Sequence, residues 1–459
     1  MNFVMVDARA RRIDPRLVRA YDLRGVVGES LREEDAHALG LRVGARVAGG
    51  LVVVGRDGRL SSPMLEAALV AGLVAGGAAV ERIGLGPTGM LYFAAHERRA
   101  AGAVMVTGSH NPPDQNGFKL LLHGEPVFGA ALAALVAESG RLAEGGRELH
   151  VTVEDAYLDR LAAAACPAPA LRVGWDPGHG ATAAVLERLT ARLPGEHRLI
   201  NAVVDGRFPG HHPDPSVPEN LAELQALVVA ERLDLGIAFD GDGDRIGVVA
   251  GDGAILWADQ LLLLLAQDVL RDRPGAAIVG DVKSSRALFD GVAAAGGRTV
   301  LSPSGYVLVR AAMRAAGAPL AGEMSGHIFY DDRWNGTDDA LHVAMRLLAA
   351  LGRIDLAAFR RALPPSFATP ELRLPCPDDR KAAVLAAVAA DLDPATLDRT
   401  DGLRVTTPEG WWLLRASGTE PKLTARVEAW TAPARDRLEA ELRARLAAAG
   451  LEDGGDRRR

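Results

Sequence analysis

The sequence predicts an α/β protein with three consecutive α/β domains and a smaller C-terminal α+β domain around a central cleft. Short apolar runs alternate with helix-like blocks along most of the chain, which is typical of mixed, mainly parallel sheets. The pattern restarts near residues 151 and 253. Beyond a proline-rich stretch at residues 363–377, which we predict to be a linker, the chain changes to a pair of hairpin-like strands.

Length and composition set the scale of this architecture. A chain of 459 residues is too long for a single hydrophobic core, so several domains are expected. We place them at residues 1–150, 151–252, 253–364 and 365–459. A net charge of -7 argues against a general nucleic-acid surface, so an anionic substrate would have to be bound by a local cluster of basic residues.

The cysteines and apolar runs bear on location. The two cysteines, Cys166 and Cys376, lie far apart and lack metal-ligand spacing, so we expect reduced thiols and a cytoplasmic protein. Residues 1–12 contain no apolar stretch typical of a signal peptide. The most apolar run, residues 261–266, is too short to span a bilayer and more simply opens a buried helix. We therefore expect no membrane partner.

A serine-bearing loop follows the strand predicted at residues 101–106. Residues 107–113 are Thr-Gly-Ser-His-Asn-Pro-Pro. Gly108 permits backbone conformations barred to other residues, which would push Ser109 clear of its neighbours. His110 is adjacent, and Lys119 follows in the next predicted segment. A serine alone is a poor nucleophile and needs a base, a metal or a stored activated group. Taken by itself, this loop could equally be an Asn-Pro turn that contains a serine with no catalytic role.

An acidic loop follows the apolar strand predicted at residues 233–239. Asp240, Asp242 and Asp244 alternate with glycines, which allow the loop to curl so that three carboxylates point at one centre. Hard oxygen ligands of this kind suit Mg²⁺. An EF-hand is excluded because Arg245 and Gly251 stand where that motif needs glycine and glutamate. An acidic β-turn is the remaining alternative.

Two later loops suit a phosphorylated sugar. Residues 322–327, Gly-Glu-Met-Ser-Gly-His, offer Glu323, Ser325 and His327 for directional hydrogen bonds to hydroxyl groups, although His327 could equally be a structural histidine. Residues 415–422, Arg-Ala-Ser-Gly-Thr-Glu-Pro-Lys, combine a guanidinium fork, hydroxyls and a lysine. That combination predicts a phosphate cradle, with a charged hairpin turn as the alternative.

Together the four loops supply the nucleophile, metal site, sugar contacts and phosphate cradle that phosphoryl transfer requires. In their order and spacing they resemble the α-D-phosphohexomutases, and most closely the bacterial phosphomannomutase/phosphoglucomutase branch, over nearly the whole chain. The resemblance implies that Ser109 carries the transferring phosphoryl group. It implies that Mg²⁺ is bound by an oxygen of that phosphoserine and by the three aspartates, Asp240, Asp242 and Asp244.

The resemblance also assigns the remaining site residues. Glu323 and Ser325 would bind the O3 and O4 hydroxyls of the sugar. The substrate phosphate would be held by Arg415, Ser417, Gly418 and Thr419. Other cleft residues would be Arg24, Lys119, Arg245, Lys283 and His327, with His110 a further catalytic candidate beside the serine. Lys119 and His327 are the acid/base candidates. Local chemistry alone predicts a surface role for Arg24, so its place in the site comes from the resemblance.

Some positions depart from the family pattern. Tyr306 stands where several members have histidine. The sequence Ser-Gly-Thr-Glu-Pro at residues 417–421 is also common in phosphoglucosamine mutases, whereas Gly108 and Met324 match the hexose branch. Phosphoglucosamine mutase therefore stays an alternative, as does a metal-dependent sugar phosphatase. The intact serine and aspartates argue against a catalytically silent sugar-phosphate binding protein.

The implied reaction interconverts hexose 1-phosphate and hexose 6-phosphate, with mannose, glucose or both as the sugar. Phospho-Ser109 would phosphorylate the free hydroxyl, and the resulting 1,6-bisphosphate would turn end for end and return its other phosphate to the serine. Hexose phosphates are thus the expected small-molecule partners, and hexose 1,6-bisphosphate the expected activator. We expect a monomer or weak dimer.

Overall fold

The computed structural model describes residues 13–47, 49–331, 334–418 and 421–451. The chain divides into two compact units. The first holds Met1–Leu261 and Ser325–Asp355, and the second holds Leu262–Met324 and Leu356–Arg459. The domain boundaries after residues 150, 252 and 364, like the central cleft, stay predictions.

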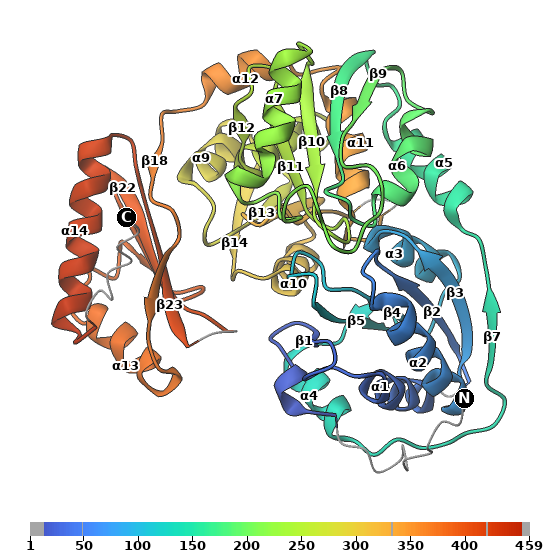
Figure 1. Cartoon of the computed structure of the whole chain (residues 1–459). Helices are drawn as coiled ribbons and strands as arrows, with labels where there is room; N and C mark the ends of the chain where they lie inside the picture. Colours follow the sequence, from blue (N-terminus) through green and yellow to red (C-terminus); the bar gives the residue numbers. More distant parts are fainter. Residues whose placement is uncertain (1–12, 48, 332–333, 419–420, 452–459) are drawn as a thin grey trace. The chain divides into compact units, whose positions relative to one another are not determined.

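The N-terminal part of the first unit is built on one mixed sheet (Figure 1). Its strands, in spatial order, are β1 (Leu23–Val26), β5 (Gln115–Leu122), β4 (Gly102–Val106), β2 (Leu51–Arg56), β3 (Ala79–Leu85) and β7 (Arg147–His150), with the short β6 (Glu125–Pro126) beside β5. Strand β2 is parallel to β3 and β4, whereas β5 is antiparallel to β1 and β4. Because β2 and β4 are parallel neighbours, the loops that follow them leave the sheet at the same edge.

Helices cover this sheet, and two of them pack very closely. The helical segments are η1 (Pro15–Leu17), α1 (Glu33–Arg46), α2 (Ser62–Ala75), α3 (Thr88–Glu97) and α4 (Gly129–Ala137). A Cβ atom on Gly40 of α1 would lie 2.1 Å from the carbonyl oxygen of Leu69 in α2. A Cβ atom on Gly72 of α2 would lie 2.1 Å from the carbonyl oxygen of His37 in α1. The two helix backbones therefore touch where both residues are glycine.

A second sheet in the first unit carries the acidic loop. Its strands, in spatial order, are β12 (Ile255–Leu256), β11 (Ile246–Ala250), β10 (Leu235–Phe239), β8 (Leu171–Asp176) and β9 (Gly195–Leu199), with α5 (Glu154–Ala164), α6 (Ala183–Thr190), η2 (Pro218–Leu221) and α7 (Ala222–Ala230) along the same stretch. All residues of β10 and β11 are buried, so the loop that joins them extends from a rigid hairpin. The loop after β8 supports it, because the amide of Ala181 donates to the carbonyl of Gly241 at 2.9 Å.

The segment from Ser325 to Asp355 returns to the first unit through β16 (Ile328–Tyr330), β17 (Thr337–Asp338) and α11 (Ala340–Ala350). Asp339 caps α11 by accepting from the amide of His342, and it also accepts from the Tyr157 hydroxyl and, at 2.7 Å, from Trp334 Nε1. The amide of Ile246 donates to the carbonyl of Gly326 at 3.1 Å. The Tyr157 contact ties the segment to α5, and the Gly326 contact ties it to the acidic hairpin.

The second unit contains a parallel set of strands and an antiparallel sheet. Strand β13 (Ala277–Asp281) pairs in parallel with β14 (Arg298–Ser302) and β15 (Leu320–Gly322). The helices that accompany them are α8 (Ala258–Asp272), which begins before the unit boundary, α9 (Arg286–Ala294), α10 (Tyr306–Ala316) and α12 (Leu356–Ala362). The antiparallel sheet has the order β18 (Phe367–Ala368), β23 (Lys422–Ala429), β22 (Gly410–Ala416), β21 (Leu403–Thr407) and β20 (Leu397–Asp398), and is covered by α13 (Asp378–Val388) and α14 (Ala432–Ala448).

The proline-rich stretch at residues 363–377 is more than the linker that its composition predicts. It contains β18 and also β19 (Leu372–Pro375), which pairs with β23 over four residues. Both β18 and β19 pair with β23 alone and therefore lie at the edge of the sheet. Proline is tolerated at sheet edges because it lacks only the backbone N–H donor. Among the helices in the described residues, none combines the length and the apolar character that crossing a bilayer requires.

Gly72→Ala tests the close approach of α1 and α2. Helix propensity alone predicts a gain of about 1 kcal/mol in the free energy of unfolding. We expect instead a loss of about 1–3 kcal/mol, because the added methyl group overpacks against the backbone of α1. Denaturant unfolding measures the change. Ala71→Gly, at an exposed position of the same helix, is the control and should lose about 0.5–1 kcal/mol. A more stable Gly72→Ala protein would contradict the contact.

Candidate active site

The serine loop and the acidic loop meet in the first unit. The Ser109 hydroxyl donates to Asp240 Oδ2 at 2.7 Å and lies 3.2 Å from His110 Nδ1. Ser109 is buried, which corrects the expectation that it stands clear of its neighbours. The left-handed backbone conformation is also at Ser109 itself, with φ of +49°, and not at Gly108. Such a conformation is costly for a residue with a side chain and persists only where surrounding contacts enforce it.

The acidic loop curls around one of its own carboxylates. Asp240 Oδ1 accepts from the amides of Gly243, Asp244 and Arg245 at 3.0, 3.0 and 3.2 Å. Gly243 has φ of +74°, so the curl predicted from the glycine spacing is present. One oxygen from each of Asp240, Asp242 and Asp244 lies within 4.8 Å of the others, and all three residues are buried.

This cluster fits a metal ion. Among the described residues, the buried Asp242 Oδ1 has no hydrogen-bond partner, which is costly for a carboxylate unless a cation binds it. Burial and the two neighbouring carboxylates raise the pKa of Asp240 well above its usual value. Like charges held this close oppose full ionisation, and a divalent cation would remove that opposition.

Lys119 supplies a positive charge to the same cluster. Its Nζ contacts Asp242 Oδ2 at 2.7 Å and also contacts Asp244 Oδ2. Burial lowers the pKa of Lys119, but Asp242 and Asp244 outweigh this effect and the net pKa lies well above the usual value. Lys119 is therefore an ammonium ion. The Thr88 hydroxyl donates to Asp242 Oδ2 at 2.7 Å and helps to fix that carboxylate.

His327 is held between a hydroxyl and two carboxylates. Its Nδ1 lies 2.9 Å from Ser325 Oγ, and its Nε2 lies 3.2 Å from Asp244 Oδ1 and 3.9 Å from Asp338 Oδ2. Burial opposes ionisation of Asp244, but Lys119 and His327 outweigh it and hold the pKa of Asp244 well below its usual value. His327 is thus part of the charge network around the acidic loop.

His110 and two arginines complete this charged group. Burial, together with the charges of Arg245 and Arg24, holds the pKa of His110 well below its usual value, so the imidazole is neutral. Arg24 lies on β1 opposite Gly117 of β5 and is buried, with its Nε bonded to Asp22 Oδ2 at 2.8 Å. Local sequence chemistry was therefore wrong to predict a surface role for Arg24. The first unit brings together Ser109, His110, Lys119, Arg24, Arg245, His327 and the three aspartates.

Ser325 also lies in the first unit, and the remaining predicted residues lie in the second. Glu323 Oε2 accepts from the amide of Gly305 at 3.0 Å, and Lys283 Nζ lies 4.0 Å from Asp281 Oδ2. Arg415 Nε donates to Asp401 Oδ2 at 2.8 Å, which orients its guanidinium. The Ser417 carbonyl accepts from Lys381 Nζ at 2.8 Å, and Gly418 follows it. Thr419 lies outside the described residues. The roles of all these residues stay predictions.

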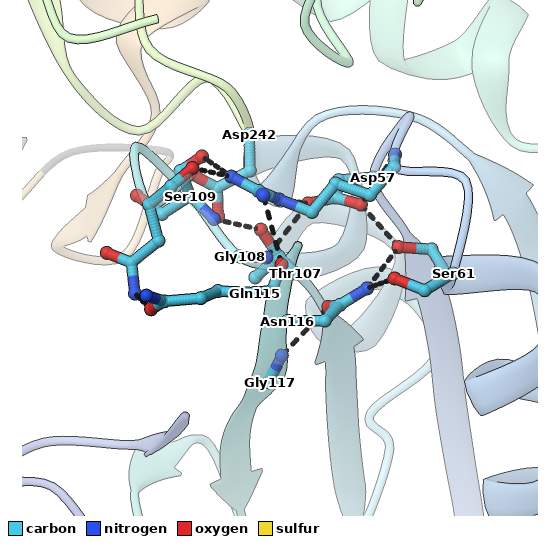
Figure 2. Close-up of polar contacts among 12 residues, drawn as sticks. Asp57, Ser61, Thr107, Gly108, Ser109, Gln115, Asn116, Gly117 and Asp242 are labelled. Atoms are coloured by element: carbon cyan, nitrogen blue, oxygen red, sulfur yellow. Dashed lines mark hydrogen bonds and ion pairs between the residues drawn. The ribbon is translucent and has the colours of Figure 1, made fainter. Parts of the chain in front are cut away.

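Sequence reasoning missed several side chains that hold the site together. Asp338 and Thr88 contact its charged groups, and Arg59 contacts the serine loop. Asp57 accepts from the amide of Gly108 in that loop (Figure 2). The sequence does contain a signal for Asp57 and Arg59, because they directly follow β2, whose carboxyl end lies beside that of β4. No local pattern marks Asp338 or Thr88.

Comparison with known proteins identifies the family. Four family models match in order: the phosphoglucomutase/phosphomannomutase alpha/beta/alpha domains I, II and III at residues 15–140, 155–253 and 257–366, and the C-terminal domain at residues 371–445. The chain belongs to the phosphoglucomutase/phosphomannomutase family. The predicted fold class and the resemblance are thereby confirmed.

Individual relatives of this family cover nearly the whole chain. The phosphomannomutase/phosphoglucomutase of Pseudomonas aeruginosa is 41% identical over 97% of this chain and 98% of that protein. The phosphoglucomutase of Neisseria gonorrhoeae is 40% identical over 93% of this chain and 96% of that protein. A crystal structure of a phosphoglucomutase/phosphomannomutase family protein from Burkholderia thailandensis matches with a TM-score of 0.87 and 39% identity, covering 95% and 98% of the two chains. Proteins with these names are isomerases, and they do not favour a phosphoglucosamine mutase or a phosphatase.

Asp338→Asn tests the buried charge network. Burial and the neighbouring Asp244 raise the pKa of Asp338 to about 7. Because the folded-state pKa exceeds the unfolded-state value, the folded protein binds more protons, and this group lowers the free energy of unfolding as pH rises from about 4 to about 7. In EDTA, the Tm difference between Asp338→Asn and wild type should therefore become more positive from pH 5 to pH 8. The exposed Asp379→Asn is the control, and a pH-independent difference for Asp338→Asn would contradict the shift.

Proposed function

We propose that this family member interconverts hexose 1-phosphates and hexose 6-phosphates, acting on both mannose and glucose. The observation that carries the proposal is the contact of the Ser109 hydroxyl with Asp240, inside a buried carboxylate cluster that fits a metal ion. A phosphoryl group stored on Ser109 would sit beside that cation. The names of the relatives support the choice of sugars.

In the proposed first half-reaction, the bond between phosphorus and Ser109 Oγ breaks as a bond forms between phosphorus and the free sugar hydroxyl oxygen. The hydroxyl proton leaves the sugar, and Ser109 Oγ is the leaving group. We assign the two proton transfers to Lys119 and His327, because both contact Asp244 beside the serine. The Lys119 ammonium would donate a proton to Ser109 Oγ as it leaves, and the His327 imidazole would accept the proton of the sugar hydroxyl. The second half-reaction reverses these steps on the other phosphate of the 1,6-bisphosphate.

We assign Mg²⁺ to Asp240, Asp242 and Asp244 together with an oxygen of phosphorylated Ser109. The ion would neutralise charge on the transferring group when bound. Oxygen donors without nitrogen or sulfur ligands favour Mg²⁺ over softer metals. The arginines Arg24 and Arg245 would add positive charge, and His110 would stay neutral beside the serine.

The second unit would supply recognition of the substrate. We assign sugar hydroxyls to Glu323 and, from the first unit, Ser325. The non-reacting phosphate is assigned to Arg415, Ser417, Gly418 and Thr419, with Lys283 as a further cation. Support comes from the ion pair of Arg415 with Asp401, which pre-orients a guanidinium fork suited to phosphate.

We also propose a cytoplasmic monomer or weak dimer, activated by hexose 1,6-bisphosphate. The two cysteines, both free, are compatible with a reducing compartment.

The decisive experiment follows phosphate through Ser109. Incubation with glucose 1,6-bisphosphate and Mg²⁺ should add one phosphoryl group to wild-type protein, because the reverse of the first half-reaction transfers a phosphoryl group from the bisphosphate to Ser109. Intact-mass spectrometry should show the increment, and Ser109→Ala should lack it. A coupled assay should show glucose 1-phosphate and mannose 1-phosphate converted to their 6-phosphates, stimulated by the bisphosphate. Steady release of inorganic phosphate instead would indicate a phosphatase, and a preference for glucosamine 1-phosphate a phosphoglucosamine mutase.

Arg415→Ala tests whether one phosphate site serves both orientations of the substrate. Charge-assisted hydrogen bonds contribute roughly 1.5–3 kcal/mol each, so KM should rise about 10- to 100-fold. The rise should be similar for glucose 1-phosphate and glucose 6-phosphate, measured in the two reaction directions, and for the mannose phosphates. Arg437→Ala, which removes an exposed arginine of α14, is the control. A loss in one direction only would mean two separate phosphate sites.

A further inference from the structure

Arg59 lies at the centre of the serine loop. It follows β2, and its side chain is fully buried. Its Nη2 donates to the carbonyl oxygens of Ser109 and Asn111 at 2.7 and 2.6 Å. Its Nη1 donates to the carbonyl oxygens of Pro112 and Gln115 at 2.5 and 3.0 Å. Figure 2 labels Gly108, Ser109 and Gln115 of this loop together with Asp57. One guanidinium therefore binds four main-chain carbonyls of a single loop.

Asp57 holds Arg59 and the loop at the same time. Its Oδ2 lies 3.2 Å from Arg59 Nε and accepts from the amide of Gly108 at 3.0 Å. Its Oδ1 accepts from the amide of Arg59 at 3.0 Å and from the Ser62 hydroxyl at 2.5 Å. The carboxylate is itself buried. Asp57 compensates the buried guanidinium charge and leaves the Nη donors to the loop carbonyls.

The loop fits this guanidinium closely. A Cβ atom on Gly108 would lie 2.2 Å from Arg59 Nε, so only glycine allows the approach. The Ser109 carbonyl bound by Arg59 also packs on the acidic loop, since a Cβ atom on Gly241 would lie 2.3 Å from that oxygen. Arg59 thus fixes the part of Ser109 that touches the acidic loop. The unfavourable φ of Ser109 is enforced by these contacts.

We propose that Arg59 is a positioning residue, which holds the Ser109 hydroxyl at the acidic cluster by organising the loop that carries it. The inference rests on the proposed role of Ser109 as phosphoryl carrier. Arg59 does not contact the reacting atoms. A lysine cannot replace it, because an ammonium ion lacks the planar fork that reaches four carbonyls at once. A small displacement of Ser109 Oγ should then slow transfer without weakening substrate binding.

Arg59→Lys tests the assignment. We expect kcat for glucose 1-phosphate to fall about 10- to 100-fold, while KM changes less than about threefold, because positioning affects the reacting atoms and not the phosphate contacts. Phosphorylation of Ser109 by glucose 1,6-bisphosphate should slow in parallel. The matched control is Arg42→Lys, since Arg42 is also buried and donates to the carbonyls of Ala38 and Glu138 at 2.8 and 2.7 Å, away from the serine loop. It should keep its kcat.

Chemical rescue separates positioning from a loss of folding. In Arg59→Ala, guanidinium ion at millimolar concentration should restore part of kcat, whereas urea, which has a similar shape but no charge, should not. Equal kcat losses in Arg59→Lys and Arg42→Lys, or a wild-type kcat in Arg59→Lys, would overturn the assignment. If Arg59→Ala does not fold, the Arg59→Lys comparison decides alone.

A readout independent of activity keeps this inference distinguishable from the proposed function. Amide hydrogen exchange should accelerate at residues 108–115 in Arg59→Lys and not in Arg42→Lys. Accelerated exchange in a protein whose wild type shows no mutase activity would support the positioning of the loop and reject the proposed function. Unchanged exchange at residues 108–115 would reject the role of Arg59, whatever the activity.

Discussion

The cost of burying several carboxylates side by side governs the first unit. Asp240, Asp242 and Asp244 are inaccessible to water, and a buried charge is tolerated only when it is paired and hydrogen-bonded. The partners that stabilise the buried charge differ among the three aspartates. Asp240 accepts three amides and the Ser109 hydroxyl, whereas Asp242 and Asp244 share Lys119. The groups that make burial possible are therefore the same groups that chemistry at Ser109 would use.

The sheets explain how residues distant in sequence reach this cluster. The loops after β2 and β4 leave one edge of the first sheet, and the loop after β10 extends from a buried hairpin. The loop after β10 is also held by the first residue of α3, since the amide of Thr88 donates to the carbonyl of Asp242 at 2.8 Å. Such loops are well placed because the scaffold beneath them is rigid, which is the usual basis for a site at strand ends.

The sequence predicted a feature correctly where the residues that form the feature are themselves part of the pattern. Glycine-spaced aspartates predicted a curled metal-binding loop, and the curl around Asp240 is present. Alternating apolar runs and helical blocks predicted the fold class. Arg24 was misjudged on local grounds because its burial arises from β1 pairing with a strand far along the chain. Ser109 was expected to stand clear of its neighbours, since the partners that enclose it come from other loops.

The contacts made by Arg59 and Asp338 could not be predicted for a related reason, although the position of Arg59 after β2 could. The significance of Arg59 depends on carbonyl groups, which every residue has and which leave no mark in a sequence. Asp338 gains importance only because the return of residues 325–355 to the first unit brings it, together with His327, close to Asp244. Such relations are properties of the folded backbone, so propensity and motif spacing do not reveal them.

The division of oxygens within the acidic cluster shows how Lys119 and a metal ion could act together. Lys119 binds the Oδ2 atoms of Asp242 and Asp244. Among the described residues, Asp242 Oδ1 has no hydrogen-bond partner, and Asp244 Oδ1 faces His327 at 3.2 Å. A cation held by the acidic cluster through Asp242 would therefore not have to displace the lysine from that carboxylate. The ammonium ion would instead orient both carboxylates, so that the group proposed for proton transfer also shapes the site proposed for the metal.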